Sequence, residues 1–175
     1  MTSSNPIDPD LFPNGLPSNE EERSRLFELY KIMVASSEAL VARRQGVNTF
    51  FLTINGAVLS AAGLVLGSGT HNRVEAAGLT VLSIAGGMLA LAWISLIKSF
   101  GQLNTGKFKV INRIEQEFPA AIYLAEWKAL GEGKDRSKYL TFTSREVWTP
   151  WAFFIVYVIA VVAELAVVVG WWQPN

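Results

Sequence analysis

The chain has 175 residues with 15 basic and 15 acidic side chains, so its net charge is zero and no bulk field favours nucleic acid. Half of the residues are hydrophobic and 17% are charged, which is less charge than a soluble domain of this length usually carries. Cysteine is absent and His71 is the single histidine, which excludes disulfides, thiol catalysis and a multi-histidine metal site. We therefore expect no metal and no cofactor.

The first part of the chain divides into a tail and a helix. Residues 1–17 are polar and rich in proline, which is typical of a disordered tail. The run Ser18-Asn19-Glu20-Glu21 is a capping box that starts a helix, and apolar residues then recur at helical spacing. Apart from Gly46, no helix breaker separates this helix from the first apolar run. Residues 18–46 are therefore predicted to form a cytoplasmic helix continuous with that run.

Three long apolar runs dominate the rest of the chain. Residues 47–66 and 76–97 carry no charge, and residues 148–172 carry one, at Glu164. A helix of about 20 residues crosses a hydrocarbon core of about 30 Å, and lipid offers the backbone no hydrogen-bond partners. Barrel strands would alternate polar and apolar residues, and these runs do not. The sequence therefore predicts three transmembrane helices.

The basic residues set the direction of these spans. All of them except Arg73 lie before the first span or between the second and third spans, and lysine and arginine collect on the cytoplasmic side of a membrane. Residues 67–75 are therefore predicted to be an external loop and residues 173–175 an external tail, with the N-terminus in the cytoplasm. The basic residues flanking the spans are candidates for headgroup contact and topology: Arg43, Arg44 and Lys98.

Residues 98–147 are predicted to be a cytoplasmic helical region. An amphipathic pattern ends before Pro119, a second short helix is predicted over 120–130, and a capping box at residues 143–146 opens the third span. These pieces are too small for a large independent core, so we expect them to pack against the N-terminal helix, within or between subunits. This favours a homo-oligomer.

Small residues recur at intervals of three and four in the first two spans, and this spacing lets membrane helices approach closely. We expect the two spans to form a tight hairpin; a water-lined path with flexible glycines is the alternative. The candidate packing seam comprises Gly56, Ser60, Gly63, Ser83 and Gly87.

Two polar side chains within the spans are candidate sites. Asn55 lies well inside the first span and is expected to make an interhelical hydrogen bond. A charge at Glu164 would be costly in lipid, by about 2.5 kcal/mol or more, so this side chain must face protein or water, or be protonated. It either lines an ion or proton path or hydrogen-bonds between subunits as a protonated carboxyl.

Reaction chemistry has little support in the sequence. The run Gly131-Glu132-Gly133-Lys134 faintly resembles a phosphate loop, but it lacks the glycine spacing, the following hydroxyl and the preceding strand, so we interpret it as a turn. His71 is placed across the membrane from the cytoplasmic serines, so no catalytic triad can form within a subunit. Glu115 and Glu117 are expected on different helix faces. The chain is therefore predicted not to be an enzyme.

A resemblance to a known family rests on several short runs. They are Ala42-Arg43-Arg44-Gln45, Asn48-Thr49-Phe50-Phe51-Leu52-Thr53-Ile54-Asn55, Ser99-Phe100-Gly101-Gln102-Leu103-Asn104, Gly106-Lys107-Phe108-Lys109-Val110-Ile111, Glu126-Trp127, Leu130-Gly131 and Lys138-Tyr139. Over about residues 26–155 the chain resembles the RipA family of octameric bacterial membrane proteins. The resemblance implies a bacterial inner-membrane homo-octamer and implies no catalytic residues; Glu164 matches no family pattern.

The sequence as a whole predicts an all-α protein with three membrane spans, a long N-terminal helix and a cytoplasmic helical segment. The favoured function is a homo-oligomeric scaffold or interaction platform in the bacterial inner membrane, with lipid and further copies of itself as partners and no nucleic acid. The alternative is an ion- or proton-conducting channel that uses Glu164. A further alternative is a regulator that binds a soluble cytoplasmic protein through residues 98–147.

Overall fold

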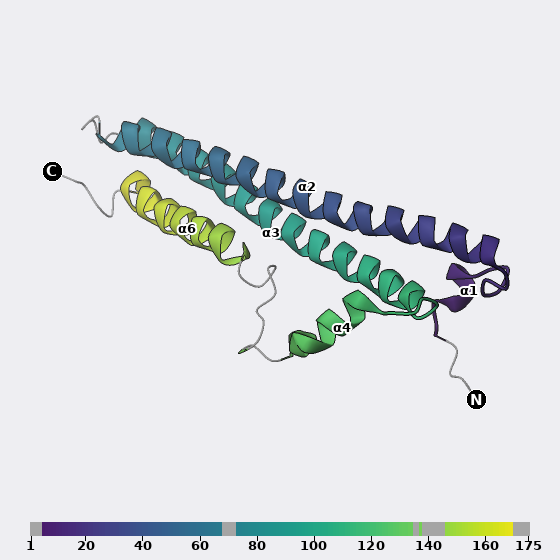
Figure 1. Ribbon diagram of the computed structural model, residues 1–175. Coiled ribbons are helices and arrows are strands. Elements are labelled where there is room, and N and C mark those ends of the chain that lie inside the picture. The colour runs from purple at the N-terminus through teal and green to yellow at the C-terminus, as the bar shows by residue number, and fades with distance from the viewer. Residues whose placement is uncertain (1–4, 68–72, 135–136, 138–145, 170–175) are drawn as a thin grey trace. The chain divides into compact units, whose positions relative to one another are not determined.

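The computed structural model describes residues 5–67, 73–134, 137 and 146–169, and these contain helices and no strand. The helices labelled in Figure 1 are α1 (Asp8–Leu11), α2 (Glu20–Gly67), α3 (Arg73–Glu115), α4 (Ile122–Ala129) and α6 (Trp148–Val169). A 3-10 turn, η1 (Gly131–Gly133), follows α4. The chain divides into two compact units. Unit 1 comprises residues 1–42 and 100–141, and unit 2 comprises residues 43–99 and 142–175.

Three helices are long and apolar enough to cross a membrane, namely α2, α3 and α6. Each contains most or all of one predicted span. The second is longer than its span: α3 continues past residue 97 to Glu115, through Gly101 and Gly106, because no proline interrupts it before Pro119. Residues 170–172 of the third predicted span lie outside the described residues, as do His71 and most of the capping box at residues 143–146.

The cap of α2 lies one residue later than expected. The side-chain oxygen of Asn19 accepts a hydrogen bond from the Glu22 amide at 2.8 Å. The Glu22 carboxylate in turn accepts one from the Ser18 amide at 2.7 Å. Asparagine caps a helix as well as serine does, and Glu22 stands three residues after it, so this pair replaces the predicted pair of Ser18 and Glu21.

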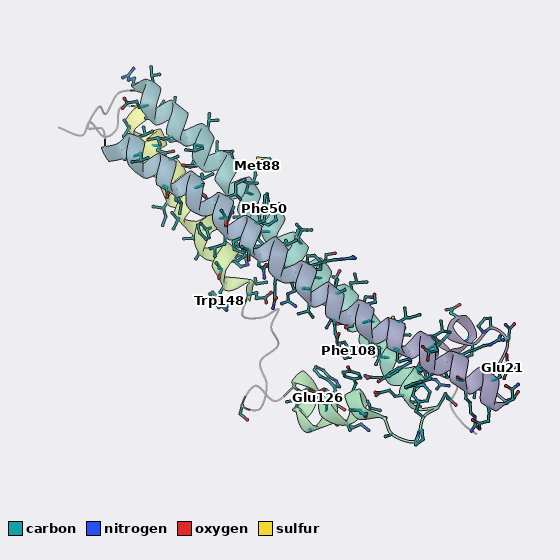
Figure 2. All side chains as sticks on the ribbon, turned by 45° about the horizontal axis from the view of Figure 1, so that its top comes forward. Glu21, Phe50, Met88, Phe108, Glu126 and Trp148 are labelled. Atoms are coloured by element: carbon teal, nitrogen blue, oxygen red, sulfur yellow. The ribbon has the colours of Figure 1, made fainter. Side chains whose placement is uncertain are left out.

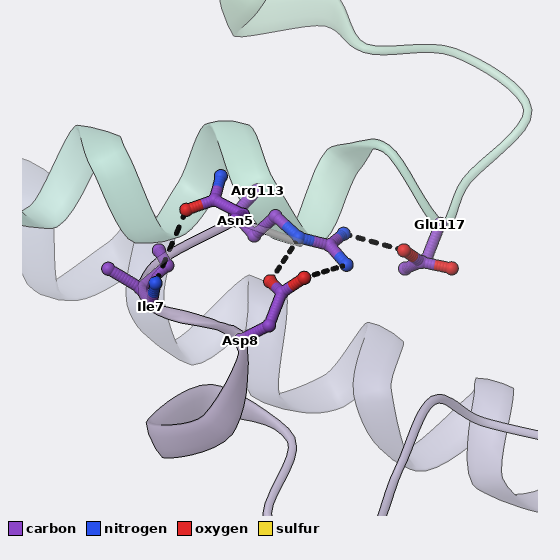
Figure 3. A network of polar contacts seen from close by, with 5 residues as sticks. All are labelled: Asn5, Ile7, Asp8, Arg113 and Glu117. Atoms are coloured by element: carbon purple, nitrogen blue, oxygen red, sulfur yellow. Dashed lines mark hydrogen bonds and ion pairs between the residues drawn. The ribbon is translucent and has the colours of Figure 1, made fainter. Parts of the chain in front are cut away.

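The N-terminal stretch of unit 1 differs from the predicted tail over residues 1–17, because Asp8–Leu11 form the short helix α1. Both oxygens of Asp8 accept hydrogen bonds from the Arg113 guanidinium, at 2.5 and 3.2 Å, and Glu117 accepts a third at 2.5 Å (Figure 3). The guanidinium also lies 5.0 Å from the ring centre of Phe12. A buried arginine needs carboxylate partners, and composition alone does not reveal that Asp8 supplies one.

Acid is expected to release α1. The hydrogen bond from Arg113 lowers the pKa of Asp8, so the contact stabilises above the ordinary aspartate value of about 4 and is lost as the pH falls through the lowered value. A spin label on Asn14→Cys, in a chain otherwise free of cysteine, reports this directly. Its mobility should rise in acid in the wild type. The mobility of the label should already be high at neutral pH in Asp8→Asn and should match the wild type in the control Asp10→Asn. Equal mobility in Asp8→Asn and the wild type at neutral pH would contradict the expectation.

Unit 2 has an aromatic core. The ring of Phe51 on α2 stacks on that of Trp93 on α3, with centroids 5.8 Å apart and planes within 9°, and Ile97 completes the cluster. Phe153 of α6 packs against it, with its ring 6.3 Å from that of Trp93. The three long apolar helices therefore share one core in unit 2, and this core positions the polar side chains considered next.

Candidate functional site

Four polar side chains of unit 2 form a connected cluster. Arg44 of α2 donates from Nε to a carboxylate oxygen of Glu146 at 2.6 Å, and Asn48 donates to the same oxygen at 3.2 Å. The indole N–H of Trp93 donates to the side-chain oxygen of Asn48 at 2.8 Å. The cluster thus joins α2, α3 and the residue that lies two positions before α6.

This cluster changes the role expected for one of the basic residues. The Arg44 side chain is only 12% exposed and is paired with Glu146, so its guanidinium neutralises a protein carboxylate. Arg43 and Lys98 are exposed, and their headgroup contact stays a prediction.

Tyr157 is placed against a glycine of the neighbouring helix. Its side chain is 2% exposed, and a Cβ built on Gly86 of α3 would overlap its ring. Its hydroxyl donates to the backbone carbonyl of Asn55 on α2 at 3.2 Å. The absence of a side chain at Gly86 is therefore what lets the ring lie on the α3 backbone and reach α2.

Asn55 is fully buried, but its side chain does not make the expected interhelical bond. Its Nδ2 donates to the Phe51 carbonyl of its own helix at 2.8 Å. Instead, the Tyr157 hydroxyl of α6 donates an interhelical hydrogen bond to the backbone oxygen of Asn55. Its side-chain oxygen is buried and has no hydrogen-bond partner among the described residues.

Glu164 lies within unit 2 against α3. One carboxyl oxygen accepts a hydrogen bond from the Ser83 hydroxyl at 3.1 Å, and Thr80, about one turn away on α3, also places its hydroxyl near this carboxyl. The other oxygen is buried without a partner in the described part of the chain. The carboxyl is thus bonded within the chain through one oxygen, and both expectations for Glu164, the ion or proton path and the bond between subunits, stay predictions.

The two small-residue stripes behave differently. Ser83 and Gly87 of α3 are buried, and a Cβ on Gly87 would come within 4 Å of Tyr157 and Phe154 on α6. On α2, a Cβ on Gly56 or Gly63 would meet nothing within 4 Å, and Ser60 is exposed. The α3 half of the predicted seam is therefore packed, but against α6 rather than α2. The expected hairpin seam between the first two spans is wrong, because the packed face of α2 is the one that carries Phe51.

A buried carboxylate organises unit 1. Glu115 is 1% exposed and accepts hydrogen bonds from the Tyr30 hydroxyl at 2.9 Å and from the amides of Tyr123 and Leu124 at 3.1 Å each. It thereby caps the first turn of α4, where free amides favour an anion. Burial, and then the bond to this carboxylate, raise the pKa of Tyr30. Glu117 bonds Arg113 instead, so the two glutamates act separately, as expected.

The run at residues 131–134 forms a tight turn, as predicted. Gly131, Glu132 and Gly133 all have positive φ, and the Lys134 ammonium lies 2.6 Å from the Glu132 carboxylate. The lysine is thus paired with a neighbouring acid rather than left to hold a phosphate. In the part of the chain that the structure describes, no group of three histidine or acidic side chains could hold a metal ion.

Sequence reasoning missed three of the residues that make these contacts. Tyr157 places a hydroxyl within an apolar run, and a buried tyrosine hydroxyl usually has a hydrogen-bond partner. The sequence alone could therefore have indicated a polar contact at this residue. Trp93 carries the same kind of signal in its indole N–H. Glu146 appeared only as the end of a capping box, and nothing local connects it with Arg44, 102 residues away.

The helices and their buried polar contacts define a helical protein with three candidate membrane spans. A family model described as the octameric membrane protein family (8xMP) matches residues 27–166, which is most of the chain. The chain belongs to this octameric membrane protein family. No curated protein and no solved structure matches it.

Proposed function

We propose that this chain is a homo-octameric scaffold of the bacterial inner membrane, of the RipA type, in which the small-residue face of α2 contacts a neighbouring subunit. In this proposal the N-terminus and residues 98–147 lie in the cytoplasm, where the latter form a helical collar that offers a surface to soluble partner proteins, and the C-terminus is external. The proposal assigns the chain no reaction.

The observation that carries the proposal is the open face of α2. Its glycines meet no other side chain within the subunit, although small residues at this spacing normally serve close helix contacts. The hydroxyls on this face bond carbonyls of their own helix, Thr49 to Gln45 at 3.1 Å and Ser60 to Gly56 at 2.8 Å. Because these two hydroxyls already have partners, they do not resist burial against another helix. The family to which the chain belongs is named for an eightfold assembly.

Bulky substitutions on this face test the proposal. Gly56→Leu and Gly63→Leu should convert the octamer to smaller species when masses are measured in nanodiscs, because a leucine holds two helices apart. The matched control is Gly78→Leu on α3, where an added Cβ also meets nothing within 4 Å; it should leave the octamer intact. A photo-crosslinking residue at Ser60 should capture a second copy of the chain. Intact octamers in all three variants, without crosslinks, would refute the proposal.

A second candidate function, ion or proton conduction, is favoured by one observation. Glu164 keeps one buried carboxyl oxygen without a partner in the described residues, and intramembrane carboxyls often mark ion or proton paths. Flux into liposomes should then occur with the wild type, vanish in Glu164→Gln, and persist in the control Glu38→Gln, an exposed acid of α2. Absence of wild-type flux under proton, sodium and potassium gradients would exclude this function and leave the scaffold proposal standing.

A further inference from the structure

Unit 1 contains a cleft between α3 and α4 that none of the contacts described so far explains. It encloses about 370 Å³, at the lower end of the range typical of ligand sites. The α3–α4 cleft is lined by Asn104, Phe108 and Asn112 on one side and by Tyr123, Glu126 and Trp127 on the other. Figure 2 labels Phe108 on α3 and Glu126 on α4.

The walls of the cleft are held in place without a ligand. Glu115 accepts hydrogen bonds from the amides of Tyr123 and Leu124, which fixes the start of α4 on the end of α3. The rings of Phe108 and Tyr123 meet edge to face, with centroids 5.6 Å apart and planes at 74°. A preformed site binds with a smaller ordering cost, so these contacts favour a cleft that accepts a ligand as it stands.

The apolar lining and one polar atom restrict the chemistry of that ligand. Phe108, Tyr123 and Trp127 offer aromatic surface, which suits an aromatic or other apolar body. The side-chain oxygen of Asn112 is buried and has no hydrogen-bond partner among the described residues. Buried acceptors are normally satisfied, so this oxygen calls for an N–H or O–H group from whatever occupies the cleft.

Opposite charges stand on the two sides of the cleft. Lys109 lines it from α3 and Glu126 from α4, and both are exposed. In the described part of the chain neither forms an ion pair, unlike Lys134 with Glu132 or Arg113 with Glu117. A simple anion would meet the carboxylate and a simple cation the ammonium, whereas a molecule with both charges satisfies both.

The geometry points to a binding site for a small zwitterion with an aromatic or apolar body, of the size of an amino acid. Its ammonium faces Glu126 and donates to Asn112, its anionic group faces Lys109, and its body packs on the three rings. A lipid headgroup that carries an ammonium and a phosphate has the same pair of charges, so the test must separate the two sources. This inference does not depend on the scaffold proposal, because every residue concerned belongs to one chain.

Saturation-transfer NMR on the full chain in lipid-free detergent provides the test, with four probes. L-tryptophan has both charges and a ring; tryptamine lacks the anion, indole-3-propionate lacks the cation, and glycerophosphoethanolamine lacks the ring. L-tryptophan should bind at least tenfold more tightly than either singly charged analogue. Displacement of L-tryptophan by glycerophosphoethanolamine would support the zwitterion site with a lipid headgroup as its source, and failure to displace it would assign the site to a free molecule.

Variants connect the signal with the cleft. Asn112→Leu, Lys109→Met and Glu126→Gln should each weaken L-tryptophan binding at least tenfold. The control Gln102→Leu changes an exposed residue of α3 that does not line the cleft, and it should bind like the wild type. The inference would be overturned if all three indole probes bound equally well, or if no probe bound at all. It would also be overturned if the three cleft variants left L-tryptophan binding unchanged.

Discussion

Gly86→Ala is expected to destabilise the three-helix core of unit 2 by about 1–3 kcal/mol, the range found for overpacked interiors. The new methyl group would occupy the place of the Tyr157 ring, which is buried and cannot swing into solvent. Displacing the ring would also break its hydroxyl bond to the Asn55 carbonyl. Thermal unfolding in detergent, followed by the fluorescence of Trp93, measures the effect.

Two further variants separate overpacking from a general effect on the helix. Gly78→Ala on the same helix adds a methyl group where nothing lies within 4 Å, and it should cost no stability. Adding Tyr157→Leu to Gly86→Ala should recover part of the loss, because the smaller side chain leaves room for the methyl group. Equal stability of Gly86→Ala and Gly78→Ala would show that the ring does not lie on the α3 backbone.

Glu115→Ala is the second change with a large expected effect. It would leave the Tyr30 hydroxyl and the amides of Tyr123 and Leu124 without their acceptor, and one unsatisfied buried donor costs about 1–3 kcal/mol. We expect α4 to detach from the end of α3, which hydrogen exchange would report as lost protection over residues 122–129.

Conservative variants at this site should cause graded, smaller losses than Glu115→Ala. Glu115→Gln keeps an acceptor but loses the charge, so protection of α4 should fall only in part. Tyr30→Phe removes one donor and leaves both amide bonds, so α4 should stay protected while unit 1 loses about 1.5–3 kcal/mol, the usual contribution of a hydrogen bond to a charged group. The exposed Gln116→Ala should change nothing. Full protection of α4 in Glu115→Ala would refute the role of the carboxylate.

The three long apolar helices were predictable because lipid leaves the backbone no other way to satisfy its polar groups. The short helix α1 and the unbroken continuation of α3 to Glu115 were not predicted. The packing faces were not predictable. Gly56 and Gly86 both stand in apolar helices, and only the ring of Tyr157 distinguishes an open glycine from one that cannot be changed.

The polar contacts depend on pairings between distant parts of the chain. Arg44 with Glu146 and Tyr30 with Glu115 are separated by 102 and 85 residues, and no local pattern selects the partner. The sequence could only require that a buried asparagine or glutamate find some partner. For Glu164 it required a protein or aqueous neighbour, or protonation of the carboxyl, and the structure supplies the hydroxyl of Ser83 as a neighbour.

Because Trp93 is buried, its intrinsic fluorescence can report on the folded state of unit 2. Its side chain is 3% exposed, whereas the other indoles in the described residues, those of Trp127, Trp148 and Trp151, are at least 39% exposed. Acrylamide in water and brominated acyl chains in the bilayer should therefore quench the outer indoles and spare this one. In a variant with Trp171→Phe and Trp172→Phe, two positions outside the described residues, the unquenched, blue-shifted fraction of the emission thus reports how much of the protein still holds its three apolar helices together.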